Sequence, residues 1–291
     1  MPPGHGHRTA PDPLISRPAC QGGEPAAFSS PFNPSVPHPA RVYGYWLGGK
    51  DHFPADRKVA EEVMDHCPQV VAGARANRAF LTRVVEHLAA EAGVSQFLDI
   101  GTGLPAPGST HETAQAIAPH ARIVYVDNDP VVLAHARALL AAGTRRGAVG
   151  CVDADVRDPA AVLANAARTL DFSRPVAILL LAVLHLIPDE NDPADIVAAL
   201  ARALAPGSYV AISHLTADFA PGQVTAAVDA YNTLAPAPVA ARTHGQITGL
   251  FADLPLVAPG VVPVTGWRPR PGDGLPRPAD LYAGLARTGR A

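Results

Sequence analysis

The chain contains few cysteines and no long apolar run, and each shortage excludes a class of protein. Its three cysteines, Cys20, Cys67 and Cys151, are widely spaced and form no C-x-x-C motif. Neither a disulfide framework nor a cysteine zinc site is therefore expected. No apolar run approaches the roughly 20 residues that span a bilayer, and no signal peptide is visible at the N-terminus. We expect a soluble cytoplasmic protein without membrane partners.

Charge is also scarce, at 17% of residues, and the formal net charge is -3. This balance argues against a general polyanion-binding surface, so no nucleic-acid partner is expected. Lys50 and Lys58 are the only lysines. Arginine therefore carries nearly all the positive charge, which together with abundant alanine and proline suggests a high-GC bacterial gene. A chain of 291 residues can form one large α/β domain with additions, or two modest domains.

Composition divides the chain into three parts. Residues 1–38 are rich in proline and glycine and lack apolar periodicity, which predicts a disordered tail. Residues 39–93 begin with an aromatic stretch at 41–53, either a packing segment or a lid, and continue into two predicted helices, 56–66 and 72–92. Residues 94–291 are expected to form the main domain.

The main domain is organised around Gln96 to Gly103, an apolar run that ends in two glycines one residue apart. The run lacks proline, which predicts a buried strand entering a tight turn, with a helix beginning near Ser109-Thr110. A dinucleotide site would need a third glycine and would gain nothing from Asp99 inside the strand. This D-x-G-x-G stretch resembles the loop of class I S-adenosylmethionine-dependent methyltransferases, which lies under the amino-acid end of the cofactor.

Predicted strands and helices alternate after this loop, which is the pattern of a parallel sheet covered on both faces. Strands are expected at 122–126, 148–152, 175–182 and 208–213, and helices at 130–142, 158–170, 192–204, 221–234 and 243–251. Residues 256–264 and 281–287 are expected to form a closing antiparallel pair. The prediction is a Rossmann-like α/β fold with a seven-stranded, mostly parallel sheet and helices on both faces.

In open α/β sheets the ligand lies beyond the carboxyl ends of the strands, and several predicted ends carry polar residues. Asp127 can accept two hydrogen bonds from a ribose diol, because Asn128 or Asp129 already suits the cap of the next helix. Asp155 can receive an adenine amino group, while Val156 packs on the ring. Either acid is alternatively a helix cap.

The fourth strand ends in Leu181 and Ala182, whose backbone would wrap the cofactor. His185 follows at the crevice, either as a satisfied structural residue or as a general base. Polar residues early in the second predicted helix, including Arg75 and Asn77, are either solvated or able to reach the carboxylate of the cofactor.

Four motifs resemble those of the bacterial S-adenosyl methyltransferase family, formerly a domain of unknown function. They are Y-G-Y-W-L-G-G-K-D at Tyr43 to Asp51, R-A-N-R-A-F-L at Arg75 to Leu81, F-L-D-I-G-T-G-L-P at Phe97 to Pro105, and V-Y-V-D-N-D-P at Val124 to Pro130. The resemblance covers residues 39–290 and implies a class I fold and S-adenosylmethionine as cofactor. The expected cofactor-binding residues are Asp99, Gly101, Thr102, Gly103, Asp127, Asn128, Asp155, Val156, Leu181 and Ala182, with Tyr43, Lys50, Arg75 and Asn77 as further candidates.

The function expected from these observations is transfer of a methyl group to an oxygen or nitrogen atom of an unidentified small molecule. Such transfer depends mainly on alignment, so a dedicated base is not required, and His185 is the one catalytic candidate. No metal-ligand cluster is visible, and no metal is expected. A non-catalytic sensor of S-adenosylmethionine or its product is the alternative. A nicotinamide-dependent oxidoreductase is disfavoured by Asp99.

Overall fold

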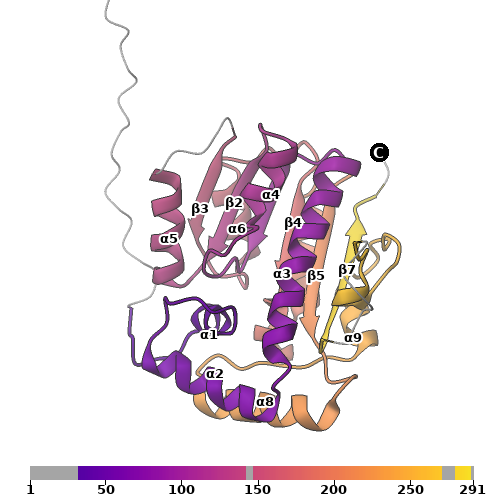
Figure 1. Cartoon of the computed structure of the whole chain (residues 1–291). Helices are drawn as coiled ribbons and strands as arrows, with labels where there is room; N and C mark the ends of the chain where they lie inside the picture. Colours follow the sequence, from indigo (N-terminus) through magenta and orange to yellow (C-terminus); the bar gives the residue numbers. More distant parts are fainter. Residues whose placement is uncertain (1–31, 142–146, 271–278, 290–291) are drawn as a thin grey trace, which may run out of the picture.

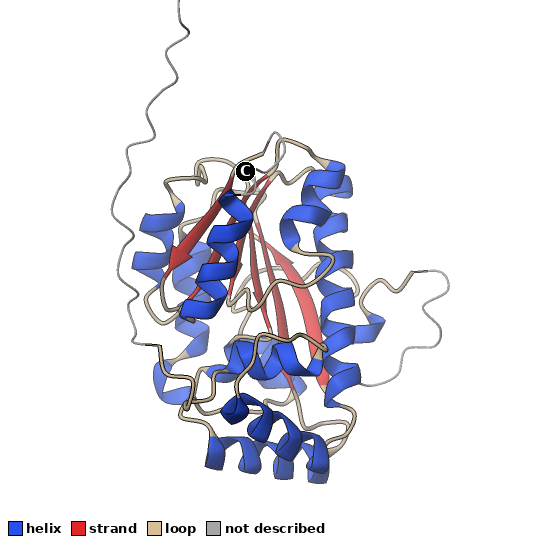
Figure 2. Ribbon diagram, turned by 60° about the vertical axis from the view of Figure 1, so that its left-hand side comes forward, coloured by secondary structure: helices blue, strands red, loops and turns tan. Residues whose placement is uncertain are grey.

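The structure is a computed structural model and describes residues 32–141, 147–270 and 279–289. A twisted sheet runs through the centre of the molecule, with helices on both faces and a further layer of helices across one end (Figures 1 and 2). Residues 1–31 of the predicted tail at 1–38, and the predicted helix end at Gly143, lie outside the described residues.

Seven strands form the sheet in the order β3-β2-β1-β4-β5-β7-β6. The first five strands pair in parallel, and β7 pairs antiparallel with both β5 and β6. Strand order reverses between β1 and β4, which is where open α/β sheets bind ligands. The predicted Rossmann-like fold with a mostly parallel sheet is thereby confirmed. The strands are β1 (Gln96–Ile100), β2 (Arg122–Asp127), β3 (Val149–Asp153), β4 (Ala177–Leu181), β5 (Tyr209–Leu215), β6 (Val262–Pro263) and β7 (Leu281–Arg287).

The predicted helices occur in the predicted order, and one helix that was not predicted, α1, precedes them. Most of the helices begin at a proline or a capping side chain. Asp158, Asp192 and Thr243 accept backbone N–H groups at the start of α6, α7 and α9, and Ser109 forms a capping box with Glu112 at α4. The helices are α1 (Pro39–Trp46), α2 (Pro54–His66), α3 (Val70–Glu86), α4 (Thr110–Ile117), α5 (Pro130–Ala141), α6 (Pro159–Ala166), α7 (Pro193–Arg202), α8 (Pro221–Leu234) and α9 (His244–Gly249). A π-helical turn, η1 (His87–Glu91), extends α3, and short 3-10 turns occur at η2 (Leu184–Leu186), η3 (Asp189–Asn191) and η4 (Val264–Gly266).

The closing pair predicted at 256–264 and 281–287 was wrong in its extent. Only β6 pairs with β7 from that first stretch, apart from an isolated bridge between Leu256 and Ala286, whereas β7 pairs with β5 along its whole length. Pro255, Pro259 and Pro263 have no N–H to donate to a ladder, which explains why the stretch cannot form a long strand.

Two apolar cores lie on opposite faces of the sheet. Side chains of α3 and α4, such as Phe80, pack on Phe97 and other residues from one face of the strands. Side chains of α6, α7 and α9, such as Val197, pack on Ile178 and its neighbours on the other face. Because both faces are covered, the carboxyl edge of the parallel strands is the part of the sheet that is left to hold a ligand.

A third cluster forms a layer, here called the roof, across this carboxyl edge, where α2 lies beside both α1 and α8 (Figure 1). Val42, Val59, Val63, Val224 and Tyr231 are buried in it. The first part of the aromatic stretch lies in α1, where Val42, Tyr45 and Trp46 pack against neighbouring helices. The roof closes one side of the space that lies beyond the carboxyl ends of the strands.

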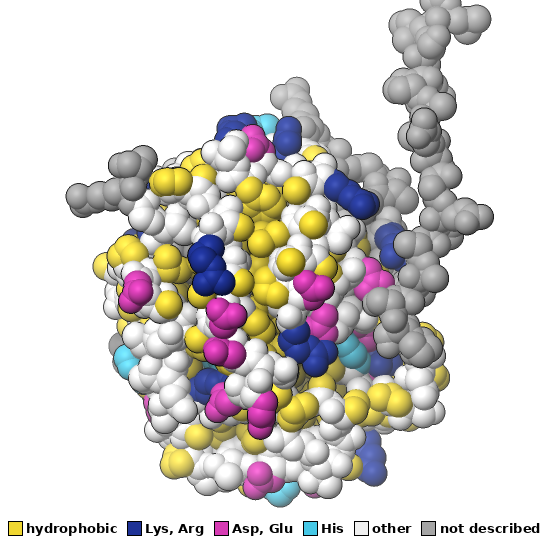
Figure 3. All heavy atoms as spheres, turned by 180° about the vertical axis from the view of Figure 1, so that it is seen from behind, with side chains coloured by type: hydrophobic (Ala, Val, Ile, Leu, Met, Phe, Trp, Pro, Cys, Tyr) yellow, Lys and Arg dark blue, Asp and Glu magenta, His cyan; other side chains and the backbone are white. Residues whose placement is uncertain are grey.

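The molecular surface on the far side of the sheet mixes acidic, basic and apolar side chains (Figure 3). No helix within residues 32–141, 147–270 and 279–289 combines the length and the apolarity needed to cross a bilayer.

Candidate active site

The turn after β1 borders the cavity that lies between the strand ends and the roof. Two glycines in this turn leave the backbone uncovered by side chains. Gly101 has φ +71° and Gly103 has φ +64°, conformations that favour glycine. A Cβ on Gly101 would lie 2.6 Å from Val183 Cγ2, whereas a Cβ on Gly103 would meet no atom within 4 Å. The turn is held by the backbone N–H groups of Gly101 and Thr102, which donate to Val126 O at 2.8 and 3.3 Å. The loop is thus a fixed, open wall that a ligand can approach closely.

Asp99 lies inside β1 and is almost fully buried. Its Oδ2 accepts a hydrogen bond of 2.6 Å from Thr110 Oγ1, at the start of α4. Burial raises the pKa of Asp99 from 3.8 to about 6, although the Thr110 hydroxyl and the charge of Arg78 oppose the shift. Burial has removed this carboxyl group from water. A bound cation would therefore stabilise its charged form.

Asp127 follows β2 and joins it to the glycine loop. Gly103 N donates to Asp127 Oδ2, and Asp129 N donates to Asp127 Oδ1, both at 2.9 Å. Burial raises the pKa of Asp127, while these two N–H groups oppose the rise. Each carboxylate oxygen retains a free lone pair, so Asp127 can still accept hydrogen bonds from a ligand.

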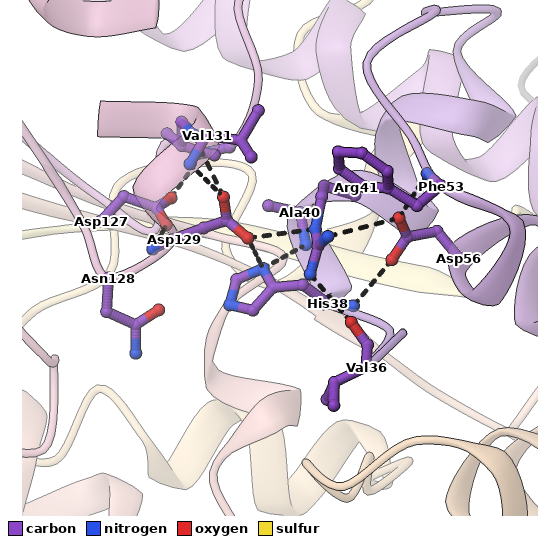
Figure 4. A network of polar contacts seen from close by, with 12 residues as sticks. Val36, His38, Ala40, Arg41, Phe53, Asp56, Asp127, Asn128, Asp129 and Val131 are labelled. Atoms are coloured by element: carbon purple, nitrogen blue, oxygen red, sulfur yellow. Dashed lines mark hydrogen bonds and ion pairs between the residues drawn. The ribbon is translucent and has the colours of Figure 1, made fainter. Parts of the chain in front are cut away.

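Asp129 connects the turn after β2 to the roof (Figure 4). Its Oδ1 accepts the backbone N–H groups of Val131 and Val132 and so caps α5. Its Oδ2 lies 3.1 Å from both Arg41 Nε and His38 Nδ1. Asp127 and Asp129 therefore belong to one turn but bind different elements. Asp127 accepts a hydrogen bond from the glycine loop, and Asp129 contacts α1.

The Arg41 guanidinium on α1 lies between two buried carboxylates. Its Nη1 is 3.6 Å from Asp56 Oδ2 on α2, and its Nη2 donates to Val36 O at 3.0 Å. Arg41, Asp56 and Asp129 are respectively 4%, 0% and 1% exposed, so these charges have little solvent to compensate them. Asp56 also accepts the backbone N–H groups of His38 and Phe53. This network fastens α1 and α2 to the start of α5.

Asp155 follows β3 and is oriented by its neighbours. Arg157 donates to both of its oxygens at 2.9 and 2.6 Å, and Asn128 Nδ2 donates at 3.2 Å. These contacts, led by the Arg157 hydrogen bonds, lower the pKa of Asp155. Asn128, Asp155 and Val156 line the cavity together.

One face of α3 adds polar groups to the cavity wall. Ala74, Asn77, Arg78 and Leu81 line the cavity, as expected for residues three and four positions apart on a helix. Arg75 is exposed and points from another face of α3, and Lys50 is also exposed; neither residue lines the cavity. The structure therefore does not support the sequence-based suggestion that Lys50 and Arg75 contact the cofactor.

A chain of hydrogen bonds links α1, α3 and two strands. Tyr43 Oη donates to Ala74 O and accepts from Asn77 Nδ2, and Ser213 Oγ donates to Asn77 Oδ1 at 2.6 Å. Ser213 Oγ in turn accepts from Ala182 N at 2.9 Å. Ala182 has φ +55°, a strained conformation for alanine, and this chain holds it. Tyr43 and Asn77 thus both line the cavity and position its wall.

His185 lies on η2, after β4, and lines the cavity. Burial and the nearby charge of Arg242 lower its pKa to about 4, so the ring is neutral at physiological pH. Its Nδ1 is buried and has no partner among the described residues. Arg242 donates to the carbonyls of Leu184 and Ile187 on either side and so fixes this turn. His185 is therefore a neutral imidazole on a rigidly held turn of the cavity wall.

His214 supports this arrangement without lining the cavity. Its ring lies edge-on to that of His185, with centroids 5.7 Å apart. Its Nδ1 is 2.7 Å from Leu215 O and its Nε2 is 2.8 Å from Arg242 Nη1, which assigns the proton to Nδ1. Burial keeps the pKa of His214 well below its ordinary value.

These residues surround a single cavity of about 810 Å³ beneath the roof. Its polar side contains the glycine loop and the strand ends with Asp99, Asp127 and Asp155. Its other part, here called the apolar lobe, is lined by Val63, Val70, Leu215, Val224, Ala227 and Val228. The volume and the mixed lining are typical of a site for a cofactor with a small organic molecule beside it. Within the described part of the chain, no group of three His, Cys, Asp or Glu side chains could hold a metal ion.

The strand order, the glycine loop and the acidic strand ends define a class I methyltransferase fold. A model of the S-adenosyl methyltransferase family matches residues 26–289, so the chain belongs to that family, and its cofactor is S-adenosylmethionine. The family to which the motifs pointed is thereby confirmed. The chain matches no curated protein sequence.

Solved structures agree with this assignment. A DUF574 family protein from Streptomyces avermitilis is 42% identical, with a TM-score of 0.83 over 87% of this chain and 97% of that one. A structure from Thermobifida fusca described as a candidate methyltransferase is also 42% identical, with a TM-score of 0.80 over 88% and 96% of the two chains. An O-methyltransferase family protein from Burkholderia thailandensis, 14% identical with a TM-score of 0.50 over 80% and 63% of the chains, shares the fold.

Sequence reasoning missed several residues of the site. Arg41, Asp56 and Asp129 were not linked, because they come from three elements that only the folded chain brings together. Tyr231 on α8 and Asp280 before β7 also line the cavity. Tyr231 could not be identified from the sequence, because it resembles any residue on the apolar face of a helix. Asp280 could not be identified because it follows a stretch without a regular pattern.

The Arg41 network predicts a large loss of stability for Arg41→Met. Removing one partner of a buried ion pair leaves uncompensated charge, here on Asp56 and Asp129, and we expect a loss of about 3–5 kcal/mol in the free energy of unfolding. Urea unfolding measures this loss. The exposed Arg75→Met on α3 is the control and should change stability by no more than about 0.5 kcal/mol. Equal effects of both variants would contradict the role of the network.

The raised pKa of Asp99 predicts that the free energy of unfolding depends on pH. Since its pKa is higher in the folded than in the unfolded chain, its contribution is complete below 3.8 and is lost as the pH rises through about 6. Relative to Asp99→Asn, the wild-type protein should lose about 1.4 kcal/mol of unfolding free energy between about pH 5 and about pH 8. Urea unfolding of both proteins across this range tests the shift, and parallel curves would show that Asp99 titrates normally.

Proposed function

We propose that the protein transfers the methyl group of S-adenosylmethionine to an oxygen or nitrogen atom of a small, largely apolar molecule. The observation that carries the proposal is the continuity of the cavity, which joins the glycine loop to the apolar lobe under one roof. Cofactor and acceptor can therefore lie in contact within one cavity. For a displacement at a methyl carbon, such alignment is the main requirement.

The residues on the polar side of the cavity fit the cofactor. S-adenosylmethionine supplies an electrophilic methyl group on a positively charged sulfonium. The open wall at Gly103 lets the ligand approach the backbone, and Asp127 has lone pairs for a ribose diol. Asp99 suits the ammonium of the amino-acid end, although Thr110 occupies one of its oxygens. Asp155 and Val156 would receive the adenine, with Thr102, Asn128, Leu181 and Ala182 completing the wall.

Binding of S-adenosylhomocysteine, the demethylated cofactor, gives the first test. Calorimetry should show micromolar affinity, and Asp127→Ala should weaken binding tenfold or more, about 1.4 kcal/mol. The control is Asp229→Ala, an exposed acid on α8. Absence of binding to the folded wild-type protein would overturn the proposal. Binding without methyl transfer to any acceptor, in a screen with labelled S-adenosylmethionine, would favour the non-catalytic sensor.

We assign His185 the role of accepting the proton of the nucleophile. Its pKa of about 4 makes it a weak base, but one that is deprotonated at every pH above about 5. With the best acceptor from the screen, His185→Ala should lower kcat by about 100-fold, the low end of general-base contributions.

Replacement by asparagine separates this role from a purely structural one, and the pH profile checks the protonation state of the ring. The wild-type kcat should not change with a histidine-like step between about pH 6 and about pH 8, because the ring remains neutral throughout. His185→Asn, which can still donate and accept hydrogen bonds, should not restore kcat. Full activity of His185→Asn would show that the imidazole only packs against the acceptor.

A further inference from the structure

Five acidic side chains line the cavity, and four of them are compensated within the protein. Asp99 accepts from Thr110 and lies near Arg78, and Asp127 accepts two backbone N–H groups. Asp129 contacts Arg41, and Asp155 contacts Arg157. Asp280 is the fifth acid, and it lies at the acceptor side of the sheet, directly before β7.

Asp280 is 7% exposed and has no comparable compensation. Its carboxylate contact is with the thiol of Cys67, whose Sγ donates to Oδ2 over 3.7 Å. Burial and the Asp280 charge raise the pKa of Cys67 to about 12, so the thiol remains a neutral, weak donor. Among the described residues no Lys, Arg or His forms an ion pair with Asp280.

Tyr231 is a second polar residue of the cavity wall, and its side chain lacks a partner among the described residues. Its side chain is 5% exposed, lines the cavity, and its Oη has no hydrogen-bond partner among the described residues. Tyr231 and Cys67 belong to the same apolar cluster of the roof. Leaving a buried hydroxyl unsatisfied carries a cost in free energy. A ligand that supplies N–H donors would satisfy the Tyr231 oxygen, and a positive charge on that ligand would compensate Asp280 in the same cavity.

The backbone at Asp280 adopts a left-handed conformation, which aspartate tolerates better than most residues. Its φ is +41°, an uncommon conformation for a residue with a side chain, and Thr216 N donates to its carbonyl at 2.9 Å. Asp280 lies in the cavity wall together with the valines of the apolar lobe.

We propose that the methyl acceptor carries an ammonium group on an apolar body, and that Asp280 and Tyr231 bind this group. The carboxylate supplies the opposite charge and the Tyr231 hydroxyl oxygen accepts an N–H, while the valines of the apolar lobe cover the rest of the molecule. Carboxylic acids and other anions are excluded from the lobe by repulsion from Asp280. This inference rests on the proposed function, because it concerns the acceptor part of the same cavity.

Calorimetry with matched probes tests the inference without turnover. The probes are hexylamine and 2-phenylethylamine, the corresponding alcohols, and hexanoate, each titrated with and without saturating S-adenosylhomocysteine. At least one amine should bind ten times more tightly than its alcohol, and hexanoate should not bind. Asp280→Asn should remove the preference for the amine, and Tyr231→Phe should weaken amine binding several-fold.

Two controls keep the outcome interpretable. Asparagine tolerates positive φ, so Asp280→Asn is expected to fold, which circular dichroism and unchanged affinity for S-adenosylhomocysteine verify. Asp229→Asn changes the same charge on the exposed side of α8 and should leave amine binding unaltered. Equal affinity for amines and alcohols, amine binding that survives Asp280→Asn, or no amine binding would overturn the inference. If S-adenosylhomocysteine still binds in those cases, the proposed function stands.

Discussion

The site depends on one buried guanidinium. Arg41 joins Asp56 of α2 to Asp129 at the start of α5, and so holds the roof over the carboxyl ends of the strands. A buried ion pair gains its value from fixed geometry more than from net stabilisation. Asp129 also donates its N–H to Asp127, which in turn holds the glycine loop. The docking of α1 and the shape of the cofactor wall are therefore set by the same short network.

The two sides of the cavity solve different chemical problems. Beside β1, β2 and β3, backbone and carboxylates provide hydrogen bonds for a polar ligand, and burial raises the pKa of Asp99 and Asp127. Beside β5 and β7, apolar side chains of α2 and α8 form the wall, with Asp280 and Tyr231 as isolated polar groups. The boundary lies at β4, where His185 faces the cavity. A reaction that joins a charged cofactor to an apolar acceptor needs this asymmetry.

Much of the fold follows from local sequence signals. The strand at Gln96–Ile100, the start of a helix near Ser109-Thr110 and the helix at Pro221–Leu234 were predicted because apolar periodicity, capping residues and prolines act over a few residues. The strand ends also marked Asp127 and Asp155, since parallel strands bring their carboxyl ends together. The pairing of β7 with β5, and the partners of Arg41 and Asp280, could not be predicted, because they join segments far apart in the chain.

Hydrogen–deuterium exchange with and without S-adenosylhomocysteine tests the central claim most directly, since it locates the ligand along the chain without requiring an acceptor. The account predicts that protection concentrates at the glycine loop 101–105, at the ends of β2 and β3, and at residues 181–186, with α1 protected through Arg41. Protection at the edge strand β6 or on α7, with the glycine loop unchanged, would contradict it.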